Sequence, residues 1–224
     1  MISPHLDDAA LSLGAAIAHT TRVGGTIRIV TVLAGDETAT FEAGPWDRSS
    51  GFETAGEAAR ARGEEDDVAC RILGALPVRL PYFDKQYGRG GEDREILAAV
   101  LNAIAGCDLL LLPGFPLNNE DHDWLARLLL EGSPRSVRIG LYAEQPYAAR
   151  ARETPAAILE PGGPWLTLEA ATTDQFVKLR ACRAYRSQIE PLGGLRVLLS
   201  VLKYEAQRGG ESISWLEDQE RRLR

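Results

Sequence analysis

The hydrophobic side chains follow two alternating patterns along the chain. Apolar and β-branched runs predict buried strands at residues 26–33, 77–84, 107–113 and 137–142, the second of which runs into a loop. Apolar side chains at helical spacing predict helices at residues 9–22, 57–73 and 93–105, and a fourth that begins at His122. Strand and helix therefore alternate from the start of the chain to about residue 145.

This alternation predicts an α/β fold of the Rossmann-like, three-layer type, in which helices cover both faces of a mostly parallel sheet. Beyond it, the pattern predicts extra C-terminal elements: strands near 156–159 and 165–170, a helix over 173–188 and an apolar helix over 195–204. The charged tail, residues 218–224, is typical of a solvated helix end. We expect one domain over residues 1–224.

Composition and charge exclude several classes of partner. The hydrophobic content is 45% and the net charge is -7, which disfavours nucleic acid or an anionic membrane surface as a partner. The sequence has no 18-residue apolar run and no signal-peptide pattern. The cysteines, Cys70, Cys107 and Cys182, are odd in number and widely spaced, as free thiols are. We therefore expect a cytoplasmic protein; a homo-oligomer stays open.

The first candidate site lies at residues 5–8, read His-Leu-Asp-Asp, between a strand stub and an Ala-rich helix. Only four residues precede it, so the first strand is very short or upstream residues are missing. On a tight turn His5 and Asp8 can face one point, which suits a metal ligand pair, and Asp7 is free to act on the metal's water. The alternative is structural: the aspartates cap the helix and His5 is an ordinary turn residue.

The second candidate site follows the buried strand at 107–113. His122 starts the next helix, so His5 and His122 both lie at strand–helix junctions, where open α/β sheets place ligands. The junctions hold no glycine-rich phosphate loop, and aspartates there would repel phosphate. A nucleotide-binding domain is therefore disfavoured.

These segments resemble a known family. Residues 3–14, Ser-Pro-His-Leu-Asp-Asp-Ala-Ala-Leu-Ser-Leu-Gly, are similar to the Pro-His-Pro-Asp-Asp-Glu signature of the PIG-L/LmbE family of zinc-dependent N-deacetylases. Residues 119–122, Asn-Glu-Asp-His, resemble the family's His-x-Asp-His motif, with Asn119 in place of the first histidine. Residues 143–147, Ala-Glu-Gln-Pro-Tyr, resemble a further segment of the family.

The resemblance implies an LmbE-like fold and a division of roles within the site. His5, Asp8 and His122 would hold Zn²⁺ or another divalent metal. The catalytic residues would be Asp7 as the base, Asn119 and Asp121. An asparagine can donate a hydrogen bond to the oxyanion, but it cannot carry the positive charge of a protonated imidazole.

Three further residues are candidates for substrate binding. Arg62 matches the arginine of the family's Arg-x-x-Glu segment, although an ion pair with Glu65 one turn away would explain it equally well. Asp84 ends a strand at the family's sugar-binding position, or caps a turn. Trp46 lies in the polar stretch at 35–56, which is too long for a plain connection and predicts a rim of the site, or else a mobile surface loop.

The resemblance implies a metal-dependent hydrolase that removes the N-acetyl group from an N-acetylglucosamine-type sugar or glycoconjugate. Two alternatives stay open. One is an amidase that acts on another amide conjugate. The other is a non-catalytic metal- or sugar-binding relative, which the replacement at Asn119 suggests.

Overall fold

The computed structural model describes residues 1–134, 136–151, 162–168 and 170–216. Its strands are β1 (Ile2–Ser3), β2 (Arg28–Thr31), β3 (Leu76–Arg79), β4 (Leu109–Phe115), β5 (Arg138–Ala143), β6 (Gly162–Leu168) and β7 (Glu211–Leu216). Its α-helices are α1 (Asp8–Arg22), α2 (Pro45–Ser49), α3 (Ala55–Leu73), α4 (Asp93–Ala103), α5 (Glu120–Gly132), α6 (Tyr147–Ala151), α7 (Thr172–Cys182), α8 (Arg186–Leu192) and α9 (Leu195–Arg208). A 3₁₀ turn, η1, spans Lys85–Tyr87.

The strands form two sheets that lie side by side. The first is parallel throughout, in the order β1-β2-β3, and the second has the order β4-β5-β7-β6. β4 and β5 are parallel, whereas β7 is antiparallel to both of its neighbours. Because β1 also packs beside β4, the order across both sheets is β3-β2-β1-β4-β5-β7-β6. The parallel part confirms the Rossmann-like expectation, with additional C-terminal elements at one edge.

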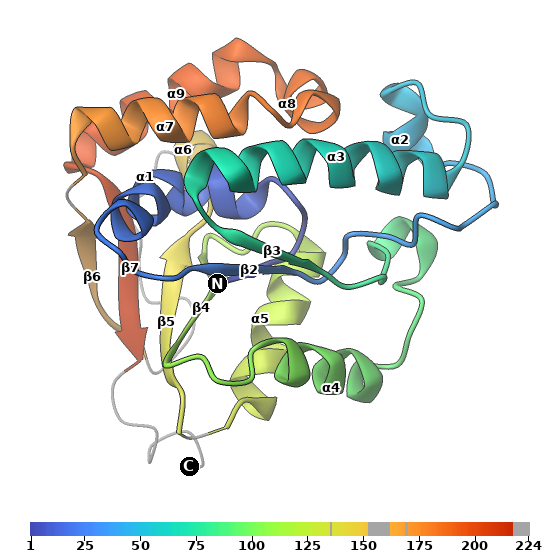
Figure 1. The fold of residues 1–224 in the computed structure, drawn as a ribbon, viewed down its shortest axis with the longest axis horizontal. Coiled ribbons are helices and arrows are strands. Elements are labelled where there is room, and N and C mark those ends of the chain that lie inside the picture. The colour runs from blue at the N-terminus through green and yellow to red at the C-terminus, as the bar shows by residue number, and fades with distance from the viewer. Residues whose placement is uncertain (135, 152–161, 169, 217–224) are drawn as a thin grey trace.

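Helices cover both faces of this sheet (Figure 1). α1 and α3 lie on one face, and α7 packs on top of both; α4 and α5 lie on the other face. Each face has its own apolar core, the first built around Leu11, Leu73 and Tyr185 and the second around Val30, Leu112 and Leu125. This is the three-layer arrangement that the alternation of strands and helices predicts.

Helix boundaries follow local chemistry where capping residues are present. Thr54 accepts a hydrogen bond from the Glu57 amide at the start of α3, and Gly74 ends that helix at φ 71°. Glu92 and Glu95 form a reciprocal capping box at the start of α4. These helices begin and end within two residues of the predicted positions.

The C-terminal part departs from the sequence prediction. The single helix expected over residues 173–188 is two helices, α7 and α8, because Tyr185 leaves the helical range (φ -79°, ψ 60°). Its ring is buried in the core, and its hydroxyl donates to Asp66 at 2.8 Å. β7 was not anticipated. The strand near 156–159 and the tail at 218–224 lie outside the described residues.

The helices and the cysteines bear on two expectations about the whole chain. In the described ranges, no helix is both long and apolar enough to cross a membrane. Cys70 and Cys182 are buried free thiols, as expected, and Cys107 is a half-buried one.

Candidate active site

The candidate site lies where β1 and β4 end, at the point where the strand order reverses. β1 leads into the turn at residues 5–8, and β4 leads into the segment at 119–122. Open α/β sheets bind ligands in the crevice at this position, because loops from neighbouring strands diverge there. The topology therefore brings together two segments that are more than one hundred residues apart in the sequence.

The turn after β1 is shaped by a buried serine that the sequence analysis did not single out. The Ser3 hydroxyl donates to the carbonyl of His5 at 2.6 Å and accepts from the amide of Ala9 at 3.1 Å. The His5 amide in turn donates to the Asp8 carboxylate at 2.7 Å. These bonds hold the turn tightly enough for the His5 and Asp8 side chains to face each other.

The capping alternative for the two aspartates is wrong in this structure. Asp7 occupies the N-cap position of α1 but makes no side-chain capping bond. Its carboxylate lines a pocket instead, and the Asp8 carboxylate turns back to His5. Neither carboxylate therefore caps the helix through its side chain, and Asp8 lies in the first turn of α1.

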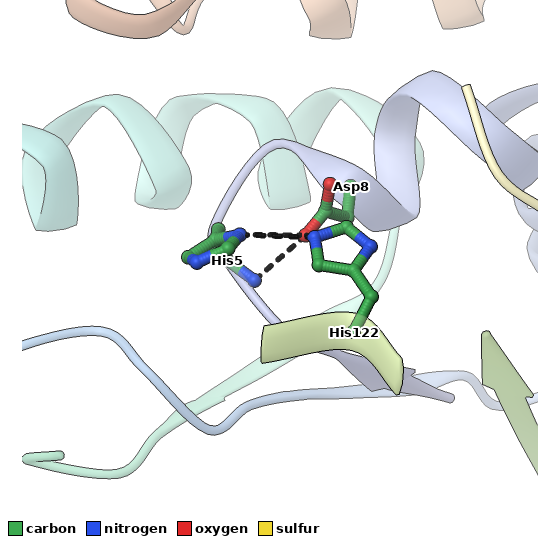
Figure 2. A group of neighbouring side chains, drawn as sticks. All are labelled: His5, Asp8 and His122. Carbon is green, nitrogen blue, oxygen red and sulfur yellow. Dashed lines mark hydrogen bonds and ion pairs between the residues drawn. The ribbon is translucent and has the colours of Figure 1, made fainter. Parts of the chain in front are cut away.

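His5, Asp8 and His122 bring one ligand atom each to a common point (Figure 2). His5 Nδ1 lies 3.3 Å from Asp8 Oδ2 and 3.1 Å from His122 Nε2, which lies 3.3 Å from the same carboxylate oxygen. In a tetrahedral zinc site with bonds of about 2.0–2.2 Å, neighbouring ligand atoms are about 3.3–3.6 Å apart. The two nitrogens and one oxygen therefore fit a divalent metal in both spacing and type.

A carboxylate stands behind each histidine. Glu144, at the end of β5, lies 2.5 Å from His122 Nδ1, which leaves Nε2 facing the other ligands. Asp121 Oδ2 lies 3.6 Å from His5 Nε2, and Arg89 and the Lys85 amide hold the Asp121 carboxylate in place. Such outer carboxylates orient metal-binding imidazoles and raise their basicity. Glu144 was not among the predicted site residues, although its segment was noted as family-like.

The electrostatics of the site favour a cation. Although burial opposes it, Asp121 and Asp8 raise the pKa of His5 to about 10. Against its own burial, His122 also has a raised pKa, because Asp8 and Glu144 face it. Carboxylates that draw protons onto two imidazoles create a negative potential, and a divalent metal would replace those protons.

We expect Glu144→Gln to weaken zinc binding by about 10- to 100-fold, because the amide orients His122 less strongly and adds no negative charge. Competition with a chromophoric chelator measures the dissociation constant directly. Glu205→Gln is the matched control, since Glu205 is a buried glutamate of α9 that faces Lys178, away from the metal ligands. Equal zinc affinity in wild type and Glu144→Gln would contradict the role of Glu144.

Asp7 differs from its neighbour in its surroundings. It is 6% exposed, and burial, followed by the charge of Asp8, raises its pKa to about 7. For Asp8, burial acts in the same direction, but His122 and His5 outweigh it and lower its pKa. Adjacent carboxylates with opposite shifts are typical of a ligand beside a general base.

A pocket of about 760 Å³ opens over these residues. Its lining includes all three candidates for substrate binding, Arg62, Asp84 and Trp46. Arg62 pairs with Asp47 at 2.6 Å. Glu65 accepts from Ser187 in α8 instead, so the alternative of an i,i+3 pair between Arg62 and Glu65 is wrong. The Arg62 Nε is buried and has no hydrogen-bond partner in the part of the chain that the structure describes.

The other two candidates combine structural and pocket-facing positions. Asp84 caps η1 through the Gln86 amide at 3.1 Å, so the turn-capping interpretation holds, and the same side chain lines the pocket. Trp46 lies in α2, a short helix within the polar stretch, and is 40% exposed at the pocket wall. The polar stretch at residues 35–56 thus contributes α2 to the rim of the pocket.

Asn119 has both of its polar atoms engaged. Its oxygen accepts from the Asp121 amide at 2.9 Å, which caps α5, and its nitrogen donates to the Tyr147 hydroxyl at 3.2 Å. The residue also lines the pocket beside Asp7. The structure therefore brings together all nine predicted site residues, with Asp121 behind His5.

Comparisons with known proteins bear on the fold and the family of this chain. The chain is similar to the solved structure of the A40926 pseudoaglycone deacetylase Dbv21, at 25% identity, with a TM-score of 0.82 over 96% of this chain and 94% of that one. It also resembles the zinc-inhibited form of the teicoplanin deacetylase Orf2, at 22% identity and a TM-score of 0.78 over 96% and 95% of the two chains. No curated protein matches.

A third structure shows that the fold alone does not decide the reaction. The 4-carboxy-2-hydroxymuconate hydratase GalB from Pseudomonas putida has a TM-score of 0.65 and 17% identity, over 96% of this chain and 93% of that one. The family model described as PIG-L, GlcNAc-PI de-N-acetylase, matches residues 1–132, more than half of the sequence. This chain therefore belongs to the PIG-L family.

Proposed function

We propose that this protein is a metal-dependent hydrolase that removes the N-acetyl group from an N-acetylglucosamine-type sugar or glycoconjugate. The observation that carries the proposal is Asp7. It is a buried carboxylate that caps nothing, has a pKa raised to about 7, and lines the pocket beside a metal-ligand group. Membership of the PIG-L family and the similarity to deacetylases support the same reaction.

The proposed metal is Zn²⁺, held by His5, Asp8 and His122. Two imidazoles and one carboxylate are typical of catalytic zinc sites, and other divalent metals accept the same donors. Such a metal, when bound, would polarise the acyl carbonyl and lower the pKa of the attacking water.

The chain's own residues would then move the protons. Asp7 takes a proton from water as the water oxygen attacks the acyl carbon, and it later returns that proton to the leaving nitrogen. Asp121 is a positioning residue, because its carboxylate faces His5. Asn119 acts on the oxyanion indirectly, because its side-chain nitrogen already donates to the Tyr147 hydroxyl at the pocket wall.

The pocket walls suggest how a sugar would bind. Arg62 and Asp84 both line the pocket, so a guanidinium donor and a carboxylate acceptor lie on the same wall and suit neighbouring hydroxyls. Trp46 provides a flat apolar face for a sugar ring or an attached group. Its position on the rim favours a sugar that is part of a larger molecule.

The test is acetate release by zinc-loaded protein from a panel of substrates. The panel contains N-acetylglucosamine, N-acetylglucosaminides with apolar aglycones, and N-acetyl amino acids. We expect release from the glucosaminides, and Arg62→Ala and Asp84→Ala should each lower kcat/KM by about 10-fold or more, since each removes a charged hydrogen-bonding partner.

Arg60→Ala is the control, because Arg60 is an exposed arginine of α3 outside the pocket. Release from amino acids but not from sugars would favour the alternative amidase. Tight zinc binding with no acetate release from any substrate would favour a binding protein and overturn the proposed hydrolase.

A further inference from the structure

The Tyr147 hydroxyl lies on the pocket wall beside the metal-ligand group. Tyr147 begins α6, and its ring packs edge-on against His122, with ring centroids 5.4 Å apart. It lines the same pocket as Asp7 and Asp8, and it is half-buried. Its hydroxyl is therefore a polar group close to the place where an acyl carbonyl would react.

The bond to Asn119 fixes the direction of this hydroxyl. The Asn119 oxygen already accepts from the Asp121 amide, so its nitrogen faces Tyr147. An amide nitrogen only donates, and the phenol oxygen must therefore be the acceptor in this bond. The hydrogen of the Tyr147 hydroxyl is left free to donate elsewhere, and no described side chain accepts it.

The backbone around Tyr147 is held on both sides. The Gln145 amide donates to the Ser12 hydroxyl of α1 at 3.1 Å. The amides of Ala148 and Ala149 donate to the Glu144 carbonyl at 2.9 Å and the Gln145 side chain at 3.2 Å. The hydroxyl is thus a fixed donor, and fixed donors stabilise a developing charge because they need no reorganisation during the reaction.

The phenol keeps its proton under ordinary conditions. A tyrosine hydroxyl is protonated and neutral near pH 7, so it can donate a hydrogen bond. Asn119, which is also neutral, cannot supply the charge of the histidine that it replaces in the family motif. The Tyr147 hydroxyl, as a neutral donor, would supply part of the oxyanion stabilisation that the missing histidine charge would otherwise give.

We propose that Tyr147 is a catalytic residue whose hydroxyl donates to the acyl oxygen as that oxygen becomes the oxyanion, and that Asn119 positions it. The proposal rests on the deacetylase function above. Water forms the new C–O bond and gives its proton to Asp7, while the carbonyl π pair moves onto the acyl oxygen. When the C–N bond breaks, the nitrogen receives the proton from Asp7 and C=O re-forms, so the products are the amine and acetic acid, which passes its remaining proton to the amine or to water and leaves as acetate.

The test compares tetrahedral and planar ligands on the zinc-loaded protein. The probe is a methylphosphonamidate analogue of the N-acetylglucosaminide, whose tetrahedral P–O⁻ mimics the oxyanion. We expect Tyr147→Phe to bind this probe at least 10-fold more weakly by calorimetry, with the KM for the acetylated sugar nearly unchanged. Its kcat should fall by about 100-fold, as for other losses of one oxyanion donor.

Asn119→Ser tests the positioning role. Serine keeps an N-cap acceptor for α5 but is too short to reach Tyr147, so folding is preserved while the orienting bond is lost. We expect a smaller fall in kcat for this variant, and no further fall when it is added to Tyr147→Phe, because both act through one hydroxyl. Additive effects would overturn the positioning role of Asn119.

Tyr82→Phe is the matched control, since Tyr82 is a half-buried tyrosine that packs against the second core outside the pocket. If Tyr147→Phe binds the tetrahedral probe as tightly as wild type does, the proposed role of Tyr147 is overturned. Acetate release by wild type would in that case still support the proposed function. A wild type that releases no acetate overturns the proposed function itself, and the Tyr147 role with it.

Discussion

Asp7→Asn should keep its zinc and lose turnover by about 100-fold or more. An asparagine has the same size and keeps the pocket shape, but its amide cannot take a proton from water at neutral pH. Asp7 is outside the group of His5, Asp8 and His122 whose ligand atoms converge, so metal binding should not need it. This variant therefore distinguishes the role of a base at Asp7 from that of a metal ligand.

The measurement pairs metal content by elemental analysis with kcat for acetate release. Asp123→Asn is the control, because Asp123 is a half-buried carboxylate of α5 that pairs with Arg127 one turn away. His122→Ala serves as the reference for loss of metal. Zinc loss in Asp7→Asn equal to that in His122→Ala would move Asp7 into the ligand set.

Local spacing, together with the resemblance to the family, explains why the first half of the site could be predicted from the sequence. His5 and Asp8 are three residues apart on one turn, and Ser3 completes that turn within the same segment. His122 could be assigned to the same place because parallel strands end at one edge of a sheet. Neither step needs knowledge of side-chain packing.

Glu144 and Tyr147 could not be assigned in the same way. Glu144 reaches His122 only because β5 pairs with β4 and the Glu144 amide donates to the Phe115 carbonyl at 2.6 Å. That register is a tertiary property, and the motif at 143–147 carries no spacing rule for it. The same holds for Arg62, whose partner Asp47 lies in the rim and not one turn away.

Two elements outside the predicted set have local signals in the sequence. Residues 212–215, Ser-Ile-Ser-Trp, alternate with a period of two, which is typical of a strand, and they form part of β7. Pro45 after Gly44 is a helix-start signal within the polar stretch, where α2 begins. The break at Tyr185 had no local signal, because the contact that causes it is with Asp66 in α3.

Lys178→Met should lower the free energy of unfolding by about 3–5 kcal/mol, since it leaves buried carboxylates without their counter-charge. Lys178 is 1% exposed, and its ammonium lies 2.6 Å from Glu205 and 2.7 Å from Glu211. Glu211 also accepts from the amides of Ala15 and Ala16 in α1. One cation thus joins α7, α9 and β7 to the helix that begins at the candidate metal site.

Urea unfolding at several pH values would measure this effect. Burial raises the pKa of Glu205 from its ordinary value of 4.5 to about 7 in the folded state. The folded state therefore binds this proton more tightly than the unfolded state does, and the free energy of unfolding falls as the pH rises from 4.5 to about 7. The loss in Lys178→Met should therefore be larger at pH 8 than at pH 5. Lys203→Met, at an exposed lysine of α9, should change stability little. A loss in Lys178→Met that is independent of pH would point to packing and not to the missing charge.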